Sequence, residues 1–154
     1  QMAPNRGSKR DIIDPVDVDL ARLEVGRTRQ LAWNGLPLIL LHRTPAQIVA
    51  ARETDVLSLQ DRLARVAGAD AKLDASDAHR VKAGQEAWLL IVAVCTKERC
   101  IIKPVEQGPP NETFICPCCA SRYDTSGRLR SGPAPHNLEV PPYKFTSPMR
   151  MQIG

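Results

Sequence analysis

Residues 95–100 read Cys-Thr-Lys-Glu-Arg-Cys, and residues 116–121 read Cys-Pro-Cys-Cys-Ala-Ser. All five cysteines of the chain lie in these two loops. The apolar run 88–94 precedes the first loop, and Phe114-Ile115 precedes the second. Because such runs are typical of buried strands, we expect each loop to follow a strand and both to bring thiols to a common point.

Three kinds of site are compatible with these spacings. The first is an iron–sulfur cluster, in which thiolates bind iron and two imidazoles can replace two of them. The second is structural zinc held by four of the five thiols, although C-x4-C is at the limit of zinc-loop spacing and C-x-C is outside it. The third is a disulfide across the loops with free thiols, which requires an oxidising compartment. An odd cysteine count leaves at least one unpaired. Spacing alone favours a metal.

Composition limits the class of protein. The chain has 154 residues, enough for one domain with a core of its own, and is 43% hydrophobic and 25% charged. The net charge of +4 is small and scattered, so we expect no nucleic-acid partner. No apolar run within the sequence is long enough for a transmembrane helix. Residues 1–15 are polar and irregular, which indicates a tether.

The first half predicts strands followed by helices. Residues 16–20 alternate strictly, which indicates a strand. Residues 29–41 predict a hairpin with Asn34-Gly35 as a type I′ turn. Pro37 would place its second strand at an edge or give it an irregular start.

Thr44-Pro45 predicts the start of a helix that runs to about Glu53. We expect a second short helix over 57–66 and a surface insertion over 67–86. The run 88–94 predicts a buried strand that ends at Cys95. The class is mostly β, with one or two outer helices. Further expected elements are a strand at 114–115, a tight hairpin at 123–129, and closing strands at 138–140, 143–145 and 149–153.

Residues 116–128, followed by Gly132–Pro141, resemble the second cluster loop, proline loop and closing strand of Rieske iron–sulfur proteins. The match is to the Rieske subunit of cytochrome bc complexes (ubiquinol–cytochrome c reductase). Val94–Cys100, Trp33-x-Gly35 and His42–Pro45 fit the same family, so the resemblance covers about residues 16–153. It implies a Rieske-type antiparallel β-sandwich over 16–154, with a small cluster-binding subdomain at about 94–136. Residues 1–15 would be the hinge after an N-terminal anchor helix that this chain does not include.

The resemblance assigns roles to six residues of the two loops and the following strand. The family's cysteine ligands fall on Cys95 and Cys116. Its inter-loop disulfide falls on Cys100 and Cys118. The hydroxyls that hydrogen-bond cluster or ligand sulfur fall on Ser121 and Tyr123.

The two histidine ligands of the family fall on Lys97 and Cys119, and neither residue is histidine. Lysine is a poor iron ligand because its amine is protonated near neutral pH. Cys119 stays a candidate metal ligand. Three further departures lie in the same loops: Glu98 replaces a leucine, and Arg99 and Ala120 replace glycines. The chain's histidines lie outside both loops, and we expect structural roles for them (His42, His79 and His136).

The resemblance implies a [2Fe-2S] carrier that passes electrons from quinol at its docking tip to a c-type cytochrome, in a membrane complex that contains cytochrome b. Such a subunit of an oxidoreductase is not catalytic alone, and it lies on the periplasmic side of the bacterial inner membrane or the mitochondrial equivalent. The ligand changes predict that the cluster is lost or altered here. One alternative is a cluster-deficient scaffold or assembly subunit, or an engineered variant. The other is a zinc or different metal site formed by Cys95, Cys116 and Cys119, with Cys100 or Cys118 added if these two are not bonded to each other.

Overall fold

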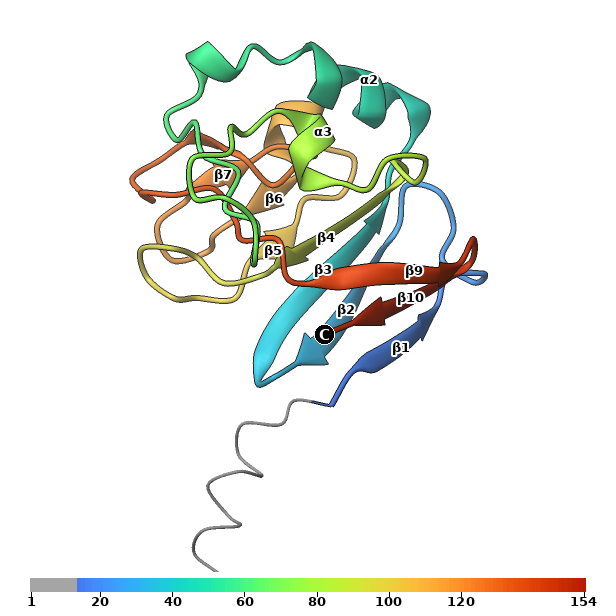
Figure 1. Cartoon of the computed structure of the whole chain (residues 1–154). Helices are drawn as coiled ribbons and strands as arrows, with labels where there is room; N and C mark the ends of the chain where they lie inside the picture. Colours follow the sequence, from blue (N-terminus) through green and yellow to red (C-terminus); the bar gives the residue numbers. More distant parts are fainter. Residues whose placement is uncertain (1–13) are drawn as a thin grey trace, which may run out of the picture.

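The computed structural model describes residues 14–154, so the tether expected over 1–15 lies almost wholly outside the described residues. The described residues form three antiparallel sheets, with strand orders β1-β10-β9, β2-β3-β4 and β5-β6-β7-β8 (Figure 1). The predicted mostly-β class is confirmed. The strands are β1 (Val16–Asp19), β2 (Thr28–Trp33), β3 (Leu36–His42), β4 (Trp88–Val92), β5 (Lys103–Pro104), β6 (Phe114–Ile115), β7 (Arg122–Tyr123), β8 (Leu129–Ser131), β9 (Tyr143–Ser147) and β10 (Arg150–Ile153).

The predicted hairpin is confirmed. β2 and β3 pair from Thr28 with Leu41 to Trp33 with Leu36. Asn34 and Gly35 have φ values of 53° and 74°, as a type I′ turn requires. Of the two alternatives given for Pro37, an edge strand is wrong, because β3 is the central strand of its sheet, whereas an irregular start agrees with the structure. Pro37 is tolerated at the irregular start of β3, since pairing with β4 begins only at the next residue.

The β3–β4 pair forms a layer between two cores. β4 is buried at every position, as its continuous apolar run predicts. Alternate residues point to opposite faces: Ile39 and Ile91 pack with the cysteine loops, whereas Leu40 and Leu90 pack against β1, β9 and β10. Both faces of the layer are therefore covered, and the strand that leads to Cys95 is held rigidly.

Helix α2 (Pro45–Glu53) has the predicted bounds and the predicted cap. Thr44 accepts a hydrogen bond from the Gln47 backbone, and the Gln47 side chain accepts one from the Thr44 backbone, which completes a capping box. The other helices within residues 14–154 are short: α3 (Asp77–Arg80) and the 3-10 turns η1 (Val56–Ser58) and η2 (Pro110–Glu112).

The helix predicted over 57–66 is wrong. After η1 the chain is extended, and its backbone groups pair with distant segments instead of with each other. The N–H of Ala64 donates to Leu73, and Val140 donates to the C=O of Arg65. Arg65 also has φ 57°, which ends any helix at that point. Long-range pairing therefore overrides the local helical preference.

The surface insertion predicted over 67–86 is wrong in part, because α3 carries two charged side chains into the core. Asp77 is 3% exposed and forms an ion pair with the buried Arg43 at 2.8 Å. Arg80 is 1% exposed and donates to the C=O groups of Ser126 (2.6 Å) and Leu138 (2.8 Å). These bonds fasten the segment to the part of the chain that follows the second cysteine loop.

Most of the remaining strands lie where the sequence predicts them. β1, β9 and β10 match the expected strands, and Tyr123 pairs with Leu129 in the expected tight hairpin. Residues 138–140 do not form a closing strand: they contribute a single parallel bridge between Val140 and Val66. No helix within residues 14–154 is long and apolar enough to cross a membrane.

Replacing Asp77 with asparagine should lower the free energy of unfolding by about 3–5 kcal/mol, because it leaves the guanidinium of Arg43 buried without its counter-charge. Burial acts to raise the pKa of Asp77, but hydrogen bonds and charge from Arg43, with a bond from Ser126, outweigh it and lower the pKa. The carboxylate therefore contributes stability above the ordinary carboxyl pKa, and this contribution is lost as the pH falls towards the lowered one.

Urea unfolding at several pH values measures both effects. Glu53→Gln, at an exposed carboxylate, is the matched control and should change stability little. An Asp77→Asn variant as stable as the control would contradict the stabilising role of the Arg43–Asp77 ion pair.

Candidate metal centre

The two cysteine loops, 95–100 and 116–121, have the same backbone form. In each, the N–H of the first residue donates to the C=O of the sixth, and the N–H of the fifth donates to the C=O of the first. The loops are thus equivalent turns, each closing the end of a strand. The four bonds are Cys95 to Cys100 (2.9 Å), Arg99 to Cys95 (3.0 Å), Cys116 to Ser121 (2.9 Å) and Ala120 to Cys116 (2.8 Å).

The fifth residue of each turn has a left-handed backbone, with φ 59° at Arg99 and φ 62° at Ala120. Glycine adopts this region without cost, whereas other residues lose about 1–2 kcal/mol there. Both residues stand where the resemblance places glycine. The turns therefore keep their shape although the residue types no longer favour it.

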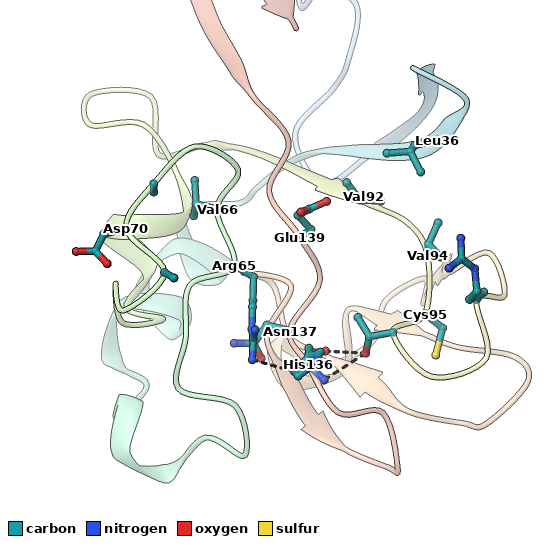
Figure 2. A pocket seen from close by; sticks show the side chains of 14 residues that line it. Leu36, Arg65, Val66, Asp70, Val92, Val94, Cys95, His136, Asn137 and Glu139 are labelled. Carbon is teal, nitrogen blue, oxygen red and sulfur yellow. Dashed lines mark hydrogen bonds between the residues drawn. The ribbon is translucent and has the colours of Figure 1, made fainter. Parts of the chain in front are cut away.

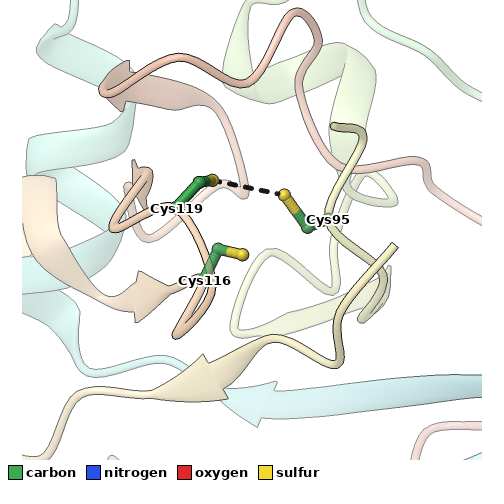
Figure 3. Close-up of side chains that lie close together, drawn as sticks. All are labelled: Cys95, Cys116 and Cys119. Carbon is green, nitrogen blue, oxygen red and sulfur yellow. Dashed lines mark hydrogen bonds between the residues drawn. The ribbon is translucent and has the colours of Figure 1, made fainter. Parts of the chain in front are cut away.

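Three thiols converge between the loops (Figure 3). The sulfurs of Cys95, Cys116 and Cys119 all lie within 4.8 Å of one another, and that of Cys95 is 3.7 Å from that of Cys119. Cys95 and Cys116 are buried, whereas Cys119 is partly exposed. The thiols assigned to metal binding are thus brought together, with one of them at the surface.

The other two cysteines form a disulfide. Cys100 of the first loop is bonded to Cys118 of the second, across a Cα–Cα distance of 6.4 Å. This covalent bond joins the two turns beside the three thiols. It also removes both sulfurs from any metal site, so the set of four thiols that a structural zinc site would use is not available here.

Hydroxyl groups lie against two of the three sulfurs. The Tyr123 hydroxyl donates to the sulfur of Cys95 at 3.9 Å, and the Ser121 hydroxyl is 3.1 Å from the sulfur of Cys119. Ser121 also accepts the backbone N–H of Ala134 at 3.0 Å, so its own proton is available for Cys119. Both hydroxyls therefore favour negative charge on sulfur.

The protein shifts the pKa values of Cys95 and Cys116 in opposite directions. Burial acts to raise the pKa of Cys95, but backbone N–H groups of Glu98 and Lys97 and the neighbouring thiols outweigh it and lower that pKa. Burial raises the pKa of Cys116 to about 11. Burial and the nearby Cys95 also raise the pKa of Tyr123, which keeps its hydroxyl protonated as a donor. Negative charge is therefore best accommodated on Cys95.

Segment 132–136, which the resemblance identifies as part of the proline loop, contacts both cysteine loops. Gly132, at φ 98°, lies so close to Ser121 that a Cβ would be 2.5 Å from its Cα. The Thr96 hydroxyl donates to the C=O of His136 at 3.1 Å. The cluster Gly-Pro-Ala-Pro was the available signal, since it indicates a rigid turn.

The residues present do not fit a cluster bound by two imidazoles. Lys97 is half exposed, and its ammonium lies 4.0 Å from the Glu98 carboxylate. Each histidine is bonded elsewhere: His42 to the C=O of Leu23, His79 to Asp74, and His136 to Arg65. The two loops bring three thiols to one point and contain no imidazole. This donor set differs from the two cysteines and two histidines of a Rieske cluster.

A pocket of about 570 Å³ opens beside Cys95 (Figure 2). Its lining combines apolar residues such as Val66 and Val94 with polar ones such as Arg65 and His136. The hydrogen bond between Arg65 and His136 (2.9 Å) lies inside this pocket. His136 therefore faces the pocket and Arg65, not the three thiols.

Known proteins resemble the chain over most of its length. The family described as the Rieske [2Fe-2S] domain matches residues 63–143. The "Ubiquinol-cytochrome c reductase iron-sulfur subunit" of Bradyrhizobium diazoefficiens is 42% identical over 140 residues, which are 91% of this chain and 72% of that protein. The protein of the same name from Rhodospirillum rubrum is 39% identical, over 90% of this chain and 69% of its own length.

Two further comparisons extend the likeness. "Cytochrome b-c1 complex subunit Rieske, mitochondrial" of Neurospora crassa is 37% identical over 90% of this chain and 53% of that protein. A chain of a solved structure titled "Hyperthermophilic respiratory Complex III" matches with a TM-score of 0.54, covering 88% of this chain and 71% of that one. At 20% identity, the latter supports the fold alone.

Thiol titration checks the pairing of the five cysteines. In denaturant without reductant, three thiols per chain should react with Ellman's reagent, and five should react after reduction. Loss of the disulfide should also lower the free energy of unfolding by about 2–4 kcal/mol. Five reactive thiols before reduction would contradict the Cys100–Cys118 bond.

Replacing Ala120 with glycine should raise the free energy of unfolding by about 0.5–1 kcal/mol. Relief of the left-handed backbone should exceed the entropy that glycine adds to the unfolded chain. Chemical denaturation measures the change. Ala71→Gly, at an exposed residue without positive φ, is the matched control and should destabilise instead. Equal losses in both variants would show that the turn at Ala120 is not strained.

Proposed function

The chain belongs to the Rieske iron–sulfur subunits of the ubiquinol–cytochrome c reductases, and we propose that it occupies that subunit's position in a complex but does not carry the histidine-ligated cluster. In this proposal the electron-carrier site is lost or altered, while the domain keeps the family's scaffold. The observation that carries the proposal is the set of three converging thiols at loops that contain no imidazole.

Ligand number supports the proposal. A [2Fe-2S] cluster takes four protein ligands. The two loops offer three sulfurs at one point, because Cys100 and Cys118 are bonded to each other. Lys97 would have to lose both a proton and its neighbouring Glu98 carboxylate to become the fourth ligand.

Redox chemistry points the same way. Histidine ligation lifts Rieske centres to about −150 to +300 mV, against about −400 mV for plant-type clusters ligated by cysteine alone. A thiolate from Cys119 adds negative charge where an imidazole would add none. Any iron centre built on these thiols would thus be a far weaker acceptor for the electrons of quinol.

The loop tip is also poorly suited to a quinol pocket. Lys97, Glu98 and Arg99 are all exposed at the turn of the first loop. Desolvating three charged side chains against an apolar pocket is costly. The partners in this proposal are therefore the cytochrome b and c-type cytochrome subunits as an assembly, with a scaffold role for this chain and no productive quinol contact.

The Cys100–Cys118 disulfide indicates in which cellular compartment the domain lies. Structural disulfides persist in oxidising surroundings such as the bacterial periplasm. Cys118 is exposed, so a reducing compartment would have access to the bond. We therefore place the domain on the periplasmic side of the inner membrane, or at the equivalent mitochondrial position.

Restoring both imidazoles tests the proposal. After anaerobic reconstitution with iron and sulfide, the unmodified chain should show no EPR signal of the mixed His/Cys type. The double variant Lys97→His/Cys119→His should acquire that signal, because the scaffold and both cysteine ligands are retained. Lys97→Ala/Cys119→Ala is the control, with the same positions changed and no imidazole gained. A mixed His/Cys signal from the unmodified chain would overturn the proposal.

A further inference from the structure

We propose that Cys95, Cys116 and Cys119 form a three-coordinate thiolate site for one thiophilic metal ion, of the class of Cu(I) or Cd(II). The inference rests on the proposed function in one respect: Cys95 and Cys116 must not be occupied by a dinuclear iron cluster. It adds a binding role for Cys119, whose family position is not a thiol.

The spacing of the sulfurs suits a single ion. With metal–sulfur bonds of about 2.3 Å, three sulfurs in a plane around one ion lie about 4.0 Å apart. The Cys95–Cys119 pair is 3.7 Å apart, and no pair among the three exceeds 4.8 Å. Small side-chain rotations would therefore centre an ion, without movement of the turns that carry the cysteines.

The number of donors selects the class of ion. Thiolates prefer soft ions over Mg²⁺ or Ca²⁺. The structural sites of zinc use four ligands, whereas the disulfide leaves three sulfurs here. Cu(I) and Cd(II) both accept three sulfur ligands, so they fit the donor set that the loops present.

Hydroxyl groups support two of the three sulfurs. The Tyr123 hydroxyl donates to the sulfur of Cys95 at 3.9 Å, and the Ser121 hydroxyl lies 3.1 Å from the sulfur of Cys119. Two of the three ligands thus have a hydrogen-bond partner outside the sulfur triangle, an arrangement that orients and stabilises metal ligands.

An entry path is present as well. Cys95 and Cys116 are 1% and 0% exposed, so neither can be reached directly from solvent. Cys119 is partly exposed and completes the triangle from the surface side (Figure 3). An ion would bind first at Cys119 and then be drawn to the two buried sulfurs.

Anaerobic titration of the purified, iron-free chain tests the site, with Cd(II) in one arm and Cu(I) delivered from a weak chelator in the other. The thiolate-to-metal charge-transfer absorbance should saturate at one ion per chain. X-ray absorption should find three sulfur neighbours. A bound ion should also protect the partly exposed thiol of Cys119 from iodoacetamide, a readout that needs no variant.

Three variants assign the ligands. Cys119→Ser should abolish stoichiometric binding. Ser121→Ala should weaken it by about 10–100-fold, the usual effect of removing a hydrogen bond to a ligand. Lys97→Ala, in the same loops but outside the sulfur triangle, should bind as the unmodified chain does.

The outcomes separate the two proposals. An absence of saturable binding in both arms, equal affinity in Cys119→Ser, or four sulfur neighbours would each overturn the three-thiolate site. If neither ion binds and iron reconstitution gives no mixed His/Cys signal, the proposed function stands and only this inference fails. If such a signal is found in the unmodified chain, the proposed function fails first.

Discussion

The structure depends on the connection between two equivalent turns, residues 95–100 and 116–121, which are held tip to tip. Each turn follows a strand, closes with the same pair of backbone hydrogen bonds, and presents a buried cysteine at its first position. The Cys100–Cys118 disulfide joins the turns covalently, and the Ala134 N–H bond to Ser121 ties segment 132–136 to the second turn. The convergence of three sulfurs follows from this arrangement, because the backbone leaves the thiols little room to separate.

Buried charge supports the turns from behind. Arg43, Arg80 and Arg128 are each at most 1% exposed and donate to carbonyl or carboxylate groups across the domain. They connect the segment around α3 to the chain that follows the second loop. Since a buried guanidinium without partners is very costly, these bonds fix the segment in one position. The same scaffold can therefore persist while the residues at the loop tips change.

Local signals in the sequence identify the regular helices and strands. They fail for segments whose conformation is determined by contacts with distant parts of the chain. The Asn34-Gly35 turn, the capped helix α2 and the buried strand β4 follow from nearest neighbours. The extended course of the chain after η1 and the burial of Asp77 depend on partners far along the chain, which a charged, weakly periodic segment does not reveal. At the centre, the grouping of Cys95, Cys116 and Cys119 came from family resemblance, because spacing left three kinds of site open. The contact of Thr96 with His136 was not predictable from either.

The family scaffold and the donor set at its tip therefore point to different chemistry, and the donor set is what determines which metal the loops can bind. This is tested by the iron and acid-labile sulfide content of the chain purified from its native source. We expect neither iron nor sulfide in stoichiometric amounts. Two irons and two sulfides per chain, with a mixed His/Cys spectrum, would show that the loops hold a Rieske cluster after all.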